Sequence, residues 1–558
     1  MKTNLFIYSI FFIVSTFSAI AQNDGKLDTE IISIIRPYDP SVSDAYKLYD
    51  YPIISDTSTE KINLKYNITS KSISTSFDIT AITPAKIGRS IFPELYRYYI
   101  KGGMGNYTSP YLELFANNQQ STKYSYGIHI KHLSINKKIN NASFSQFSNN
   151  YIDLYAKKFW DKRTLSSSIT YQRDVVDFLG GNDIEAWKKT FNSLESHLTL
   201  TSNKLKQKSF IDKISASHYF FTSNTDLNEN FFNITTNIST PITNELFNLK
   251  FSAEYLKSMG TTNAVGYTDP PTTFKMVNQN RLTLNLAPTL ITNKGNFNIN
   301  IGLNSYLDFD KADSLNEMYF YPKVDLSYVI VPDILTTYFG INGSINNNSF
   351  KKISKENPYY NLTYKKIFNT HNKIIIDAGL TGALSSKSSF NLYASYKSSY
   401  DVPFFYTTDT LSIFNTEKLA LIYDTLNTIH TKAEISIYPT NKFSLTTSFE
   451  LNKHSTAQEE KAWNLPTLKG NISANYTIKK VLLTSTIYYV GKRYSGIINN
   501  ELHELPNYID ANLSIEYFYS PLFSAFLNIN NITNSKYSKW HNYPTQGINI
   551  MGGFSYRF

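Results

Sequence analysis

Long runs of alternating apolar and polar residues constrain the fold of this chain more than any other feature. The runs lie at 281–290, 296–304, 471–478, 508–517 and 548–558, the last ending on the final residue. Nearly every second residue in them is apolar, which is the pattern of a strand with one apolar and one polar face. The runs belong to segments of about ten to fourteen residues, whereas strands of globular proteins average about five or six. We therefore predict strands that can cross the hydrocarbon layer of a membrane at a tilt.

Turn signals punctuate these runs at regular intervals. Short breaks rich in Asn, Lys, Gly and Pro fall near Gln120, Lys162, Lys206, Asn244, Lys294, Pro332, Lys387, Thr440, Lys480 and Ser520. Longer polar connections alternate with them, for example 259–278, 347–372 and 403–425. Tight turns on one side and long loops on the other are typical of outer-membrane barrels.

These spacings predict an all-β chain. With both termini in the periplasm, the breaks imply a transmembrane antiparallel β-barrel of about 22 strands, with roughly 18 to 22 acceptable. A soluble β-solenoid would show a consensus repeat every 20–30 residues or so, and none is present. A string of β-sandwiches would need shorter strands.

The composition favours a thin wall over a packed soluble core. The chain has 43 Tyr, 37 Phe and 4 Trp, or 15% aromatic residues, although only 41% of its residues are hydrophobic. Tyrosine is favoured at the two boundaries between lipid and water. The absence of cysteine excludes thiolate metal sites and cysteine nucleophiles. The net charge of +10 is scattered, so it indicates solvated loops first and attraction to anionic solutes or lipopolysaccharide phosphates second, and no compact Lys/Arg run supports nucleic-acid binding.

The N-terminal part has two further regions. Residues 1–21 have the pattern of a signal peptide: Lys2, an apolar stretch over 5–17 and the cleavage pattern Ala19-Ile20-Ala21. An uncleaved anchor is the alternative, but the stretch is short for a span. Residues 22–96 are rich in proline and alternate little, so we predict a periplasmic or lumen segment without a full plug domain. The outer-membrane β-barrel then covers 97–558, and no later run is apolar enough for a transmembrane helix.

The C-terminal region resembles the last three strands of TonB-dependent outer-membrane receptors. The resemblance is carried by PNYIDANLSIEYF (506–518), FLNINNITNSKY (526–537) and YPTQGINIMGGFSYRF (543–558). The matching positions are Asp510, Asn531, Tyr537, Pro544, Gly547 and Phe558, whereas Ile548 stands where the family usually has arginine. The resemblance implies an outer-membrane location in a Gram-negative cell, solute uptake, and a terminal aromatic residue that the barrel-assembly machinery reads.

The rest of the chain departs from that family. Residues 22–96 are too short for the family's globular plug, and no coupling segment is evident. The stretches 37–57, 102–114 and 154–160 are similar to a plugless group of TonB-dependent receptor-like barrels. That similarity implies shared ancestry and leaves open whether transport depends on TonB. A separate periplasmic protein that supplies energy coupling or a plug would then be a partner.

Few residues point to specific chemistry. His129 and His132 lie three apart on a predicted strand, so they face opposite sides and make poor joint metal ligands. The glycine-rich stretch 102–107 suits a tight outer turn better than a phosphate site. No pair of nucleophile and base stands out, so we predict no enzyme, no metal and no cofactor. The loop aromatics Trp463, Tyr494, Trp540 and Tyr543 would stack on a sugar or peptide, or else pack the loops and the interfacial girdle.

Two functions remain open. A barrel of this size has a lumen too wide for wall side chains to fill, which favours passage of a solute that enters from the outer loops. Passage would be gated by residues 22–96 or assisted by a partner. The alternative is a barrel scaffold that anchors a periplasmic or surface complex without transport of its own.

Overall fold

The computed structural model describes most of the chain after residue 95. The described residues are 96–118, 121–136, 146–178, 187–203, 210–225, 227–262, 274–275, 278–310, 315–360, 366–408 and 418–558. The predicted signal peptide, and the predicted N-terminal segment up to residue 95, lie outside these residues.

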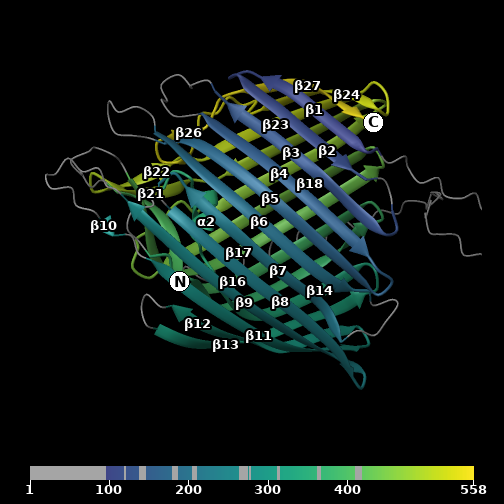
Figure 1. Ribbon diagram of the computed structural model, residues 1–558, viewed down its shortest axis with the longest axis vertical. Coiled ribbons are helices and arrows are strands. Elements are labelled where there is room, and N and C mark those ends of the chain that lie inside the picture. Colours follow the sequence, from purple (N-terminus) through teal and green to yellow (C-terminus); the bar gives the residue numbers. More distant parts are fainter. Residues whose placement is uncertain are drawn as a thin grey trace, which may run out of the picture. The chain divides into compact units, whose positions relative to one another are not determined.

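The described chain forms a closed barrel of 22 antiparallel strands (Figure 1). Each strand pairs with the next along the chain, and the first, β1, pairs with the last, β27. The barrel strands are β1 (Tyr98–Gly105), β2 (Ser109–Asn117), β3 (Tyr124–Ile135), β4 (Phe147–Phe159), β5 (Arg163–Phe178), β6 (Trp187–Ser202), β7 (Ile211–Ser223), β8 (Leu227–Ile242), β9 (Glu245–Thr262), β11 (Gln279–Lys294), β12 (Phe297–Asp310), β13 (Leu315–Val331), β14 (Leu335–Asn346), β15 (Thr370–Ser385), β16 (Ser388–Thr408), β17 (Lys418–Thr440), β18 (Phe443–Thr456), β19 (Leu468–Ile478), β20 (Val481–Val490), β23 (Tyr508–Phe518), β24 (Phe523–Asn530) and β27 (Asn549–Arg557). The predicted fold class and strand number are confirmed.

Six short elements lie outside the wall. They are β10 (Phe274–Lys275), β21 (Arg493–Ile498), β22 (Glu501–Leu505), β25 (Ser538–Trp540), β26 (Tyr543–Pro544) and the helix α2 (Phe350–Glu356). Figure 1 shows β10, β21, β22 and β26 at the end of the barrel away from the C-terminus. We call this end the outer end.

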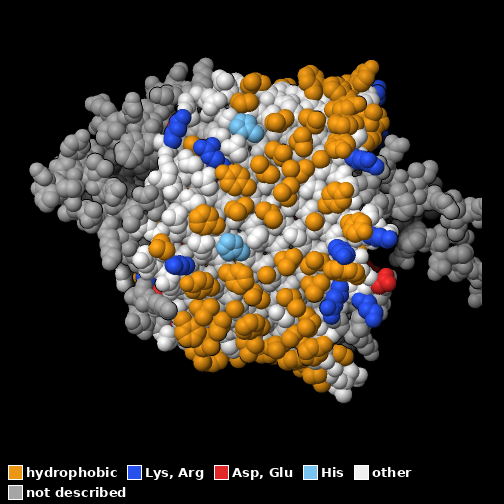
Figure 2. Space-filling view, viewed as in Figure 1, with side chains coloured by type: hydrophobic (Ala, Val, Ile, Leu, Met, Phe, Trp, Pro, Cys, Tyr) orange, Lys and Arg blue, Asp and Glu red, His pale blue; other side chains and the backbone are white. Residues whose placement is uncertain are grey.

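Alternation along each strand separates an apolar outer face from a polar lumen. In β11 the side chains of Leu282, Leu284 and Leu286 alternate with the buried Arg281 and Thr283. Outward apolar residues are well exposed, for example Phe320 at 60%. Figure 2 shows apolar side chains across the strands, with Lys and Arg gathered toward their two ends. Among the described residues no helix is long and apolar enough to cross a membrane.

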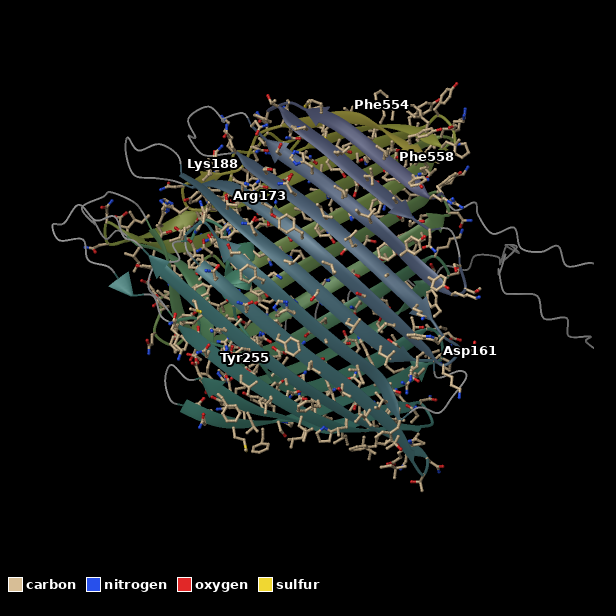
Figure 3. All side chains as sticks on the ribbon, in the orientation of Figure 1. Asp161, Arg173, Lys188, Tyr255, Phe554 and Phe558 are labelled. Atoms are coloured by element: carbon tan, nitrogen blue, oxygen red, sulfur yellow. The ribbon has the colours of Figure 1, made fainter. Side chains whose placement is uncertain are left out.

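The tight turns lie where the sequence predicts them. All ten predicted breaks fall between consecutive barrel strands or on the last residue of one, as Lys294 does in β11 and Thr440 in β17. Gln120 and Lys206 themselves lie outside the described residues. Gly295 has φ +56°, which favours glycine in the turn between β11 and β12. Figure 3 marks the two ends of the strands with Asp161, in the turn after β4, and Lys188, at the outer end of β6.

One predicted outer connection is shorter than the sequence suggests. The prediction placed a loop at 403–425, but β16 continues to Thr408 and β17 starts at Lys418. Pro403 pairs with Tyr423 there, and the register shifts between Ser399 and Val402. The bulge lets the ladder continue past the break in alternation that suggested a loop.

Glycines allow the barrel to close. In β1 and β27, Gly103 pairs with Gly553 and Gly102 with Phe554. A Cβ on Gly553 would lie 2.0 Å from the Gly102 carbonyl oxygen, so only glycine fits. Residues 102–105 therefore form the second half of β1, and the outer turn follows at 106–108, with Tyr107 at φ 61°.

Candidate functional site

The connection between β14 and β15 folds into the lumen instead of standing outside it. We call residues 347–369 the lumen segment; 361–365 lie outside the described residues. Ser349 caps its helix α2 and accepts a hydrogen bond from the Lys352 amide at 3.2 Å. Glu229, a fully buried residue of β8, accepts hydrogen bonds from the amides of Phe350 (2.8 Å) and Lys351 (3.2 Å). A carboxylate at a helix N-terminus is stabilised by these free amides.

Polar contacts tie both ends of the lumen segment to one arc of the wall. Glu195 of β6 pairs with Lys351 at 2.6 Å. The other ties run from Lys189 of β6 to the Tyr360 carbonyl (2.6 Å), from Gln279 of β11 to the Ile367 carbonyl (2.8 Å), and from Arg281 of β11 to the carbonyls of Ile367 (3.0 Å) and Asn348. Because all these wall residues are buried or half-buried, each contact satisfies a polar group that the lumen would otherwise leave without a partner.

An apolar cluster joins the lumen segment to the opposite wall. It contains Phe191, Phe221, Leu227, Phe350, Ile353, Tyr360, Ile367, Phe405, Leu419, Leu421 and Trp540. These residues come from β6 to β8, the segment, β16, β17 and β25. As β6 and β17 are the sixth and sixteenth strands of the ring, they lie on nearly opposite sides. Burial raises the pKa of Tyr360 well above its usual value, so this hydroxyl stays neutral.

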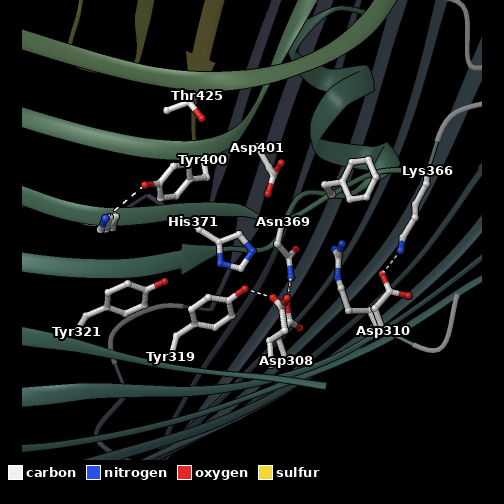
Figure 4. Close-up of a pocket in the computed structure, with 14 residues that line it drawn as sticks. Asp308, Asp310, Tyr319, Tyr321, Lys366, Asn369, His371, Tyr400, Asp401 and Thr425 are labelled. Carbon is white, nitrogen blue, oxygen red and sulfur yellow. Dashed lines mark hydrogen bonds and ion pairs between the residues drawn. The ribbon is translucent and has the colours of Figure 1, made fainter. Parts of the chain in front are cut away.

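A cavity of about 590 Å³ lies between the lumen segment and the wall. Figure 4 shows it lined by side chains of β12, β13, β15 and β16 together with the end of the segment. Tyr319 and Tyr321 of β13 face it, since they alternate with the outward Met318 and Phe320. The ring of His371 lies 4.6 Å from that of Tyr319.

The carboxylates of the cavity also hold the end of the lumen segment. Asp308 accepts a hydrogen bond from the Asn369 side chain at 2.8 Å, and Asp310 pairs with Lys366 at 3.0 Å. Glu317 and Asp401 line the cavity as well. Any solute that takes over Asp308 or Asp310 therefore competes directly with the segment.

The positions matched by the resemblance build the outer loops near the C-terminus. The Tyr537 hydroxyl donates to Asp510 at 2.6 Å, and its ring stacks on Tyr508 at 3.7 Å. Burial, followed by the Asp510 carboxylate, raises the pKa of Tyr537. Asn531 donates from its side chain to the carbonyls of Ser535 (2.9 Å) and Gln546 (2.7 Å).

The other matched positions complete this picture. Pro544 pairs with Ser538 between β26 and β25, and a Cβ on Gly547 would lie 2.4 Å from the Asn534 side chain. The structure thus brings five matched positions into one loop region. Phe558 lies at the other end of the barrel, stacked on Tyr98 at 5.0 Å.

Each of the four loop aromatics lies beside contacts within the protein. Trp463 is 1% exposed and donates to Glu459 at 2.7 Å, and the neighbouring Asn464 amide donates to the Tyr494 carbonyl at 2.7 Å. Trp540 is buried in the apolar cluster, while Tyr543 stacks on Tyr359 of the lumen segment at 3.8 Å. This burial favours loop packing for both tryptophans. Ligand stacking on Tyr494 or Tyr543 stays a prediction.

Sequence reasoning missed the lumen segment. Its signal was present in the apolar pair Phe350 and Ile353, spaced for one helix face directly after a capping serine. The two histidines considered earlier have separate partners, His129 with Glu113 and His132 with Asn150. No group of three His, Cys, Asp or Glu side chains in the described part of the chain converges as a metal site.

Comparison with known proteins supports the architecture. No family model matches the chain, and no curated protein matches it. Several solved structures do. The FrpB iron transporter from Neisseria meningitidis (F5-1 variant, apoprotein) matches with a TM-score of 0.65 and 9% identity, over 84% of this chain and 82% of that chain. The barrel has the fold of the outer-membrane receptors.

Two further structures agree with this assignment of the fold. The pyoverdine outer-membrane receptor FpvA from Pseudomonas aeruginosa matches with a TM-score of 0.62 and 12% identity, over 83% of this chain and 79% of that one. The copper transporter OprC matches with a TM-score of 0.61 and 10% identity, over 84% of each chain. Together with the apolar outer face, this fold indicates the outer membrane of a Gram-negative cell.

Proposed function

We propose that this barrel passes a solute inward across the outer membrane and that the lumen segment is its outer gate. The observation that carries this proposal is the way the segment joins nearly opposite walls through the apolar cluster. The similar solved structures are an iron transporter, a copper transporter and a pyoverdine receptor. They support uptake in general, without indicating a substrate.

Several partners belong to this proposal. Outer-membrane lipid contacts the apolar face, lipopolysaccharide contacts Lys and Arg side chains at the outer end, and the barrel-assembly machinery reads Phe558. A periplasmic protein supplies energy coupling or a plug. Under the alternative function, a scaffold, the outer loops would instead hold a stable partner, and a stoichiometric protein would co-purify with the barrel.

Conductance in planar bilayers tests the gate. Asn346 and Thr370 are cross-strand partners, so a short Gly-Ser turn can replace residues 347–369 without straining the wall. We expect the replacement to open a steady conductance that the full chain lacks. The matched control replaces 497–502, the tip of the β21–β22 hairpin, with the same turn and should stay closed. A shortened barrel that folds and remains silent would refute the gate.

A further inference from the structure

The cavity beside the lumen segment offers hydrogen-bond acceptors to a solute. Asn369 is 4% exposed, lines the cavity, and its side-chain oxygen has no hydrogen-bond partner in the described structure. Nδ1 of His371 also has no hydrogen-bond partner in the described structure, and it accepts or donates according to the tautomer of the ring. Asp401 is exposed, and no hydrogen bond or ion pair within the described residues engages its carboxylate. Figure 4 shows these three side chains pointing toward the middle of the cavity, with Asp308 below them.

The cationic side chains of the cavity are already engaged. Arg281 is 3% exposed and uses both terminal nitrogens on backbone carbonyls of the segment. Lys366 pairs with Asp310, and Lys373 lies 3.4 Å from the Tyr400 hydroxyl. Arg281 and Lys366 therefore have little to offer an anionic solute, whereas Lys373 keeps donors for one. Four carboxylates, those of Asp308, Asp310, Glu317 and Asp401, line the cavity against these three cations, so the balance of charge favours a solute that donates.

Aromatic rings around the cavity add a second feature. Lys366 lies over the ring of Phe368 at 5.3 Å, and Lys373 lies over the ring of Tyr400 at 5.7 Å. Ring faces at this distance attract cations. With Tyr319 and Tyr321 on the other side, the cavity can also pack an apolar or aromatic body. Its volume of about 590 Å³ is within the usual range for small-molecule sites.

We propose that this cavity binds a small solute through a protonated amine or guanidinium group, with Asp401, Asn369 and Asp308 as its acceptors. This inference rests on the proposed function, because it names the solute class that the gate would admit. A bare metal ion is a poorer fit, since no three ligating side chains converge within the described residues.

Equilibrium binding to the purified full-length protein tests the solute class. The probe is tyramine, a protonated amine on a phenol ring, and its counterpart is 4-hydroxyphenylacetate, which places a carboxylate on a similar body. Ligand-observed NMR and calorimetry would measure both dissociation constants. We expect tyramine to bind and the carboxylate analogue to bind at least about tenfold more weakly, because one charge-assisted contact contributes that much.

Asp401→Asn is the diagnostic variant. Asp401 has φ 53°, a conformation that asparagine adopts readily, so the exchange removes charge and keeps the backbone. We expect it to weaken tyramine binding about tenfold or more. The matched control is Asp325→Asn on β13, a lumen carboxylate that accepts from Asn300 at 2.9 Å outside the cavity; it should bind tyramine as the unchanged protein does.

The outcomes separate this proposal from the gate. Absence of tyramine binding, equal binding of both probes, or equal losses in the two variants would each overturn the amine site. In all three cases, conductance after replacement of residues 347–369 would still support passage of a solute through the barrel. Conversely, selective tyramine binding by a barrel that does not conduct even after replacement of residues 347–369 would support the amine site and refute the passage of a solute.

Discussion

Removing the charge of Glu229 is the sharpest way to test how the lumen segment is held. The Glu229→Gln exchange keeps the size of a residue that is fully buried. One carboxylate oxygen accepts from the Phe350 amide, and the other accepts from the Lys351 amide and the Tyr219 hydroxyl. Glutamine offers one acceptor and one NH₂ group. Whichever way the amide turns, at least one buried donor then faces another donor.

The size of the effect follows from these contacts. Losing one charge-assisted hydrogen bond and leaving a buried N–H without an acceptor costs about 2–4 kcal/mol. If the closed state alone carries that contact, the ratio of open to closed barrels rises about 30-fold to several hundredfold. Single-channel recording in planar bilayers measures this ratio directly as the open probability.

Two control variants make the outcome interpretable. Glu195→Gln breaks a partly exposed ion pair with Lys351. We expect this to destabilise the closed barrel by about 1 kcal/mol and to raise the ratio of open to closed barrels roughly fivefold. Glu450→Gln removes a lumen charge on β18, between the outward Phe449 and Leu451, and should leave the open probability unchanged. The reasoning fails if a folded Glu229→Gln barrel opens no more often than the unchanged protein. It also fails if Glu450→Gln opens equally, since lumen charge alone would then explain the effect.

Three further predictions concern the wall and the outer loops. Tyr537→Phe removes the bond to Asp510 and should lower the free energy of unfolding by about 1–2 kcal/mol in detergent. The folded-state pKa of Tyr537 is raised above its usual 10.0, so the contribution of this residue is complete below pH 10 and is lost as the pH rises further; the phenylalanine variant should lack that alkaline loss. Gly553→Val should prevent closure of β1 on β27 and abolish the heat-modifiable band of a folded barrel, whereas Gly470→Ala, where a Cβ meets only ordinary contacts, should retain it. Deleting Phe558 removes the ring stacked on Tyr98 and the carbonyl that accepts from the Tyr98 amide at 2.9 Å, so less barrel should reach the outer membrane, while Phe558→Tyr should assemble normally.

The local sequence pattern is sufficient to predict the strands of the wall, because each strand alternates apolar and polar residues along its own length. Leu282 and Leu284 face outward because lipid lies outside the barrel. Gly295 lies in a tight turn and has a positive φ, which glycine adopts readily. The resemblance located Asp510 and Tyr537, which the structure joins. The lumen segment depends on a contact between Glu229 and Phe350, which are 121 residues apart. Alternation indicates that Glu229 faces the lumen, but it cannot indicate which loop returns to meet it.

A solute cation can replace only part of the contacts that hold the lumen segment. Residues 350–360 rest in the apolar cluster, where burial of Phe350 or Ile353 contributes about 1.5–3 kcal/mol each. Residues 366–369 are held by Asp308 and Asp310, and also by Gln279, Arg281 and the burial of Ile367. A solute cation can replace only the contacts of Asp308 and Asp310. Replacing one hydrogen-bond donor by another changes the free energy of the closed barrel little. A ligand shifts the equilibrium between closed and open barrels only by the difference between its affinities for the two states.

Tyramine should therefore release Lys366 and Asn369, while the buried Ile367, the helix α2 and the apolar cluster stay in place. In the unchanged protein we expect tyramine to leave the barrel closed, because the Glu229 contacts and the apolar cluster still hold α2. In Glu229→Gln the remaining tie is weaker, so the same tyramine concentration should raise the open probability severalfold beyond the effect of the exchange itself. A wild-type barrel that tyramine opens by itself would mean that the polar contacts of Asp308 and Asp310, and not the apolar cluster, keep the gate shut.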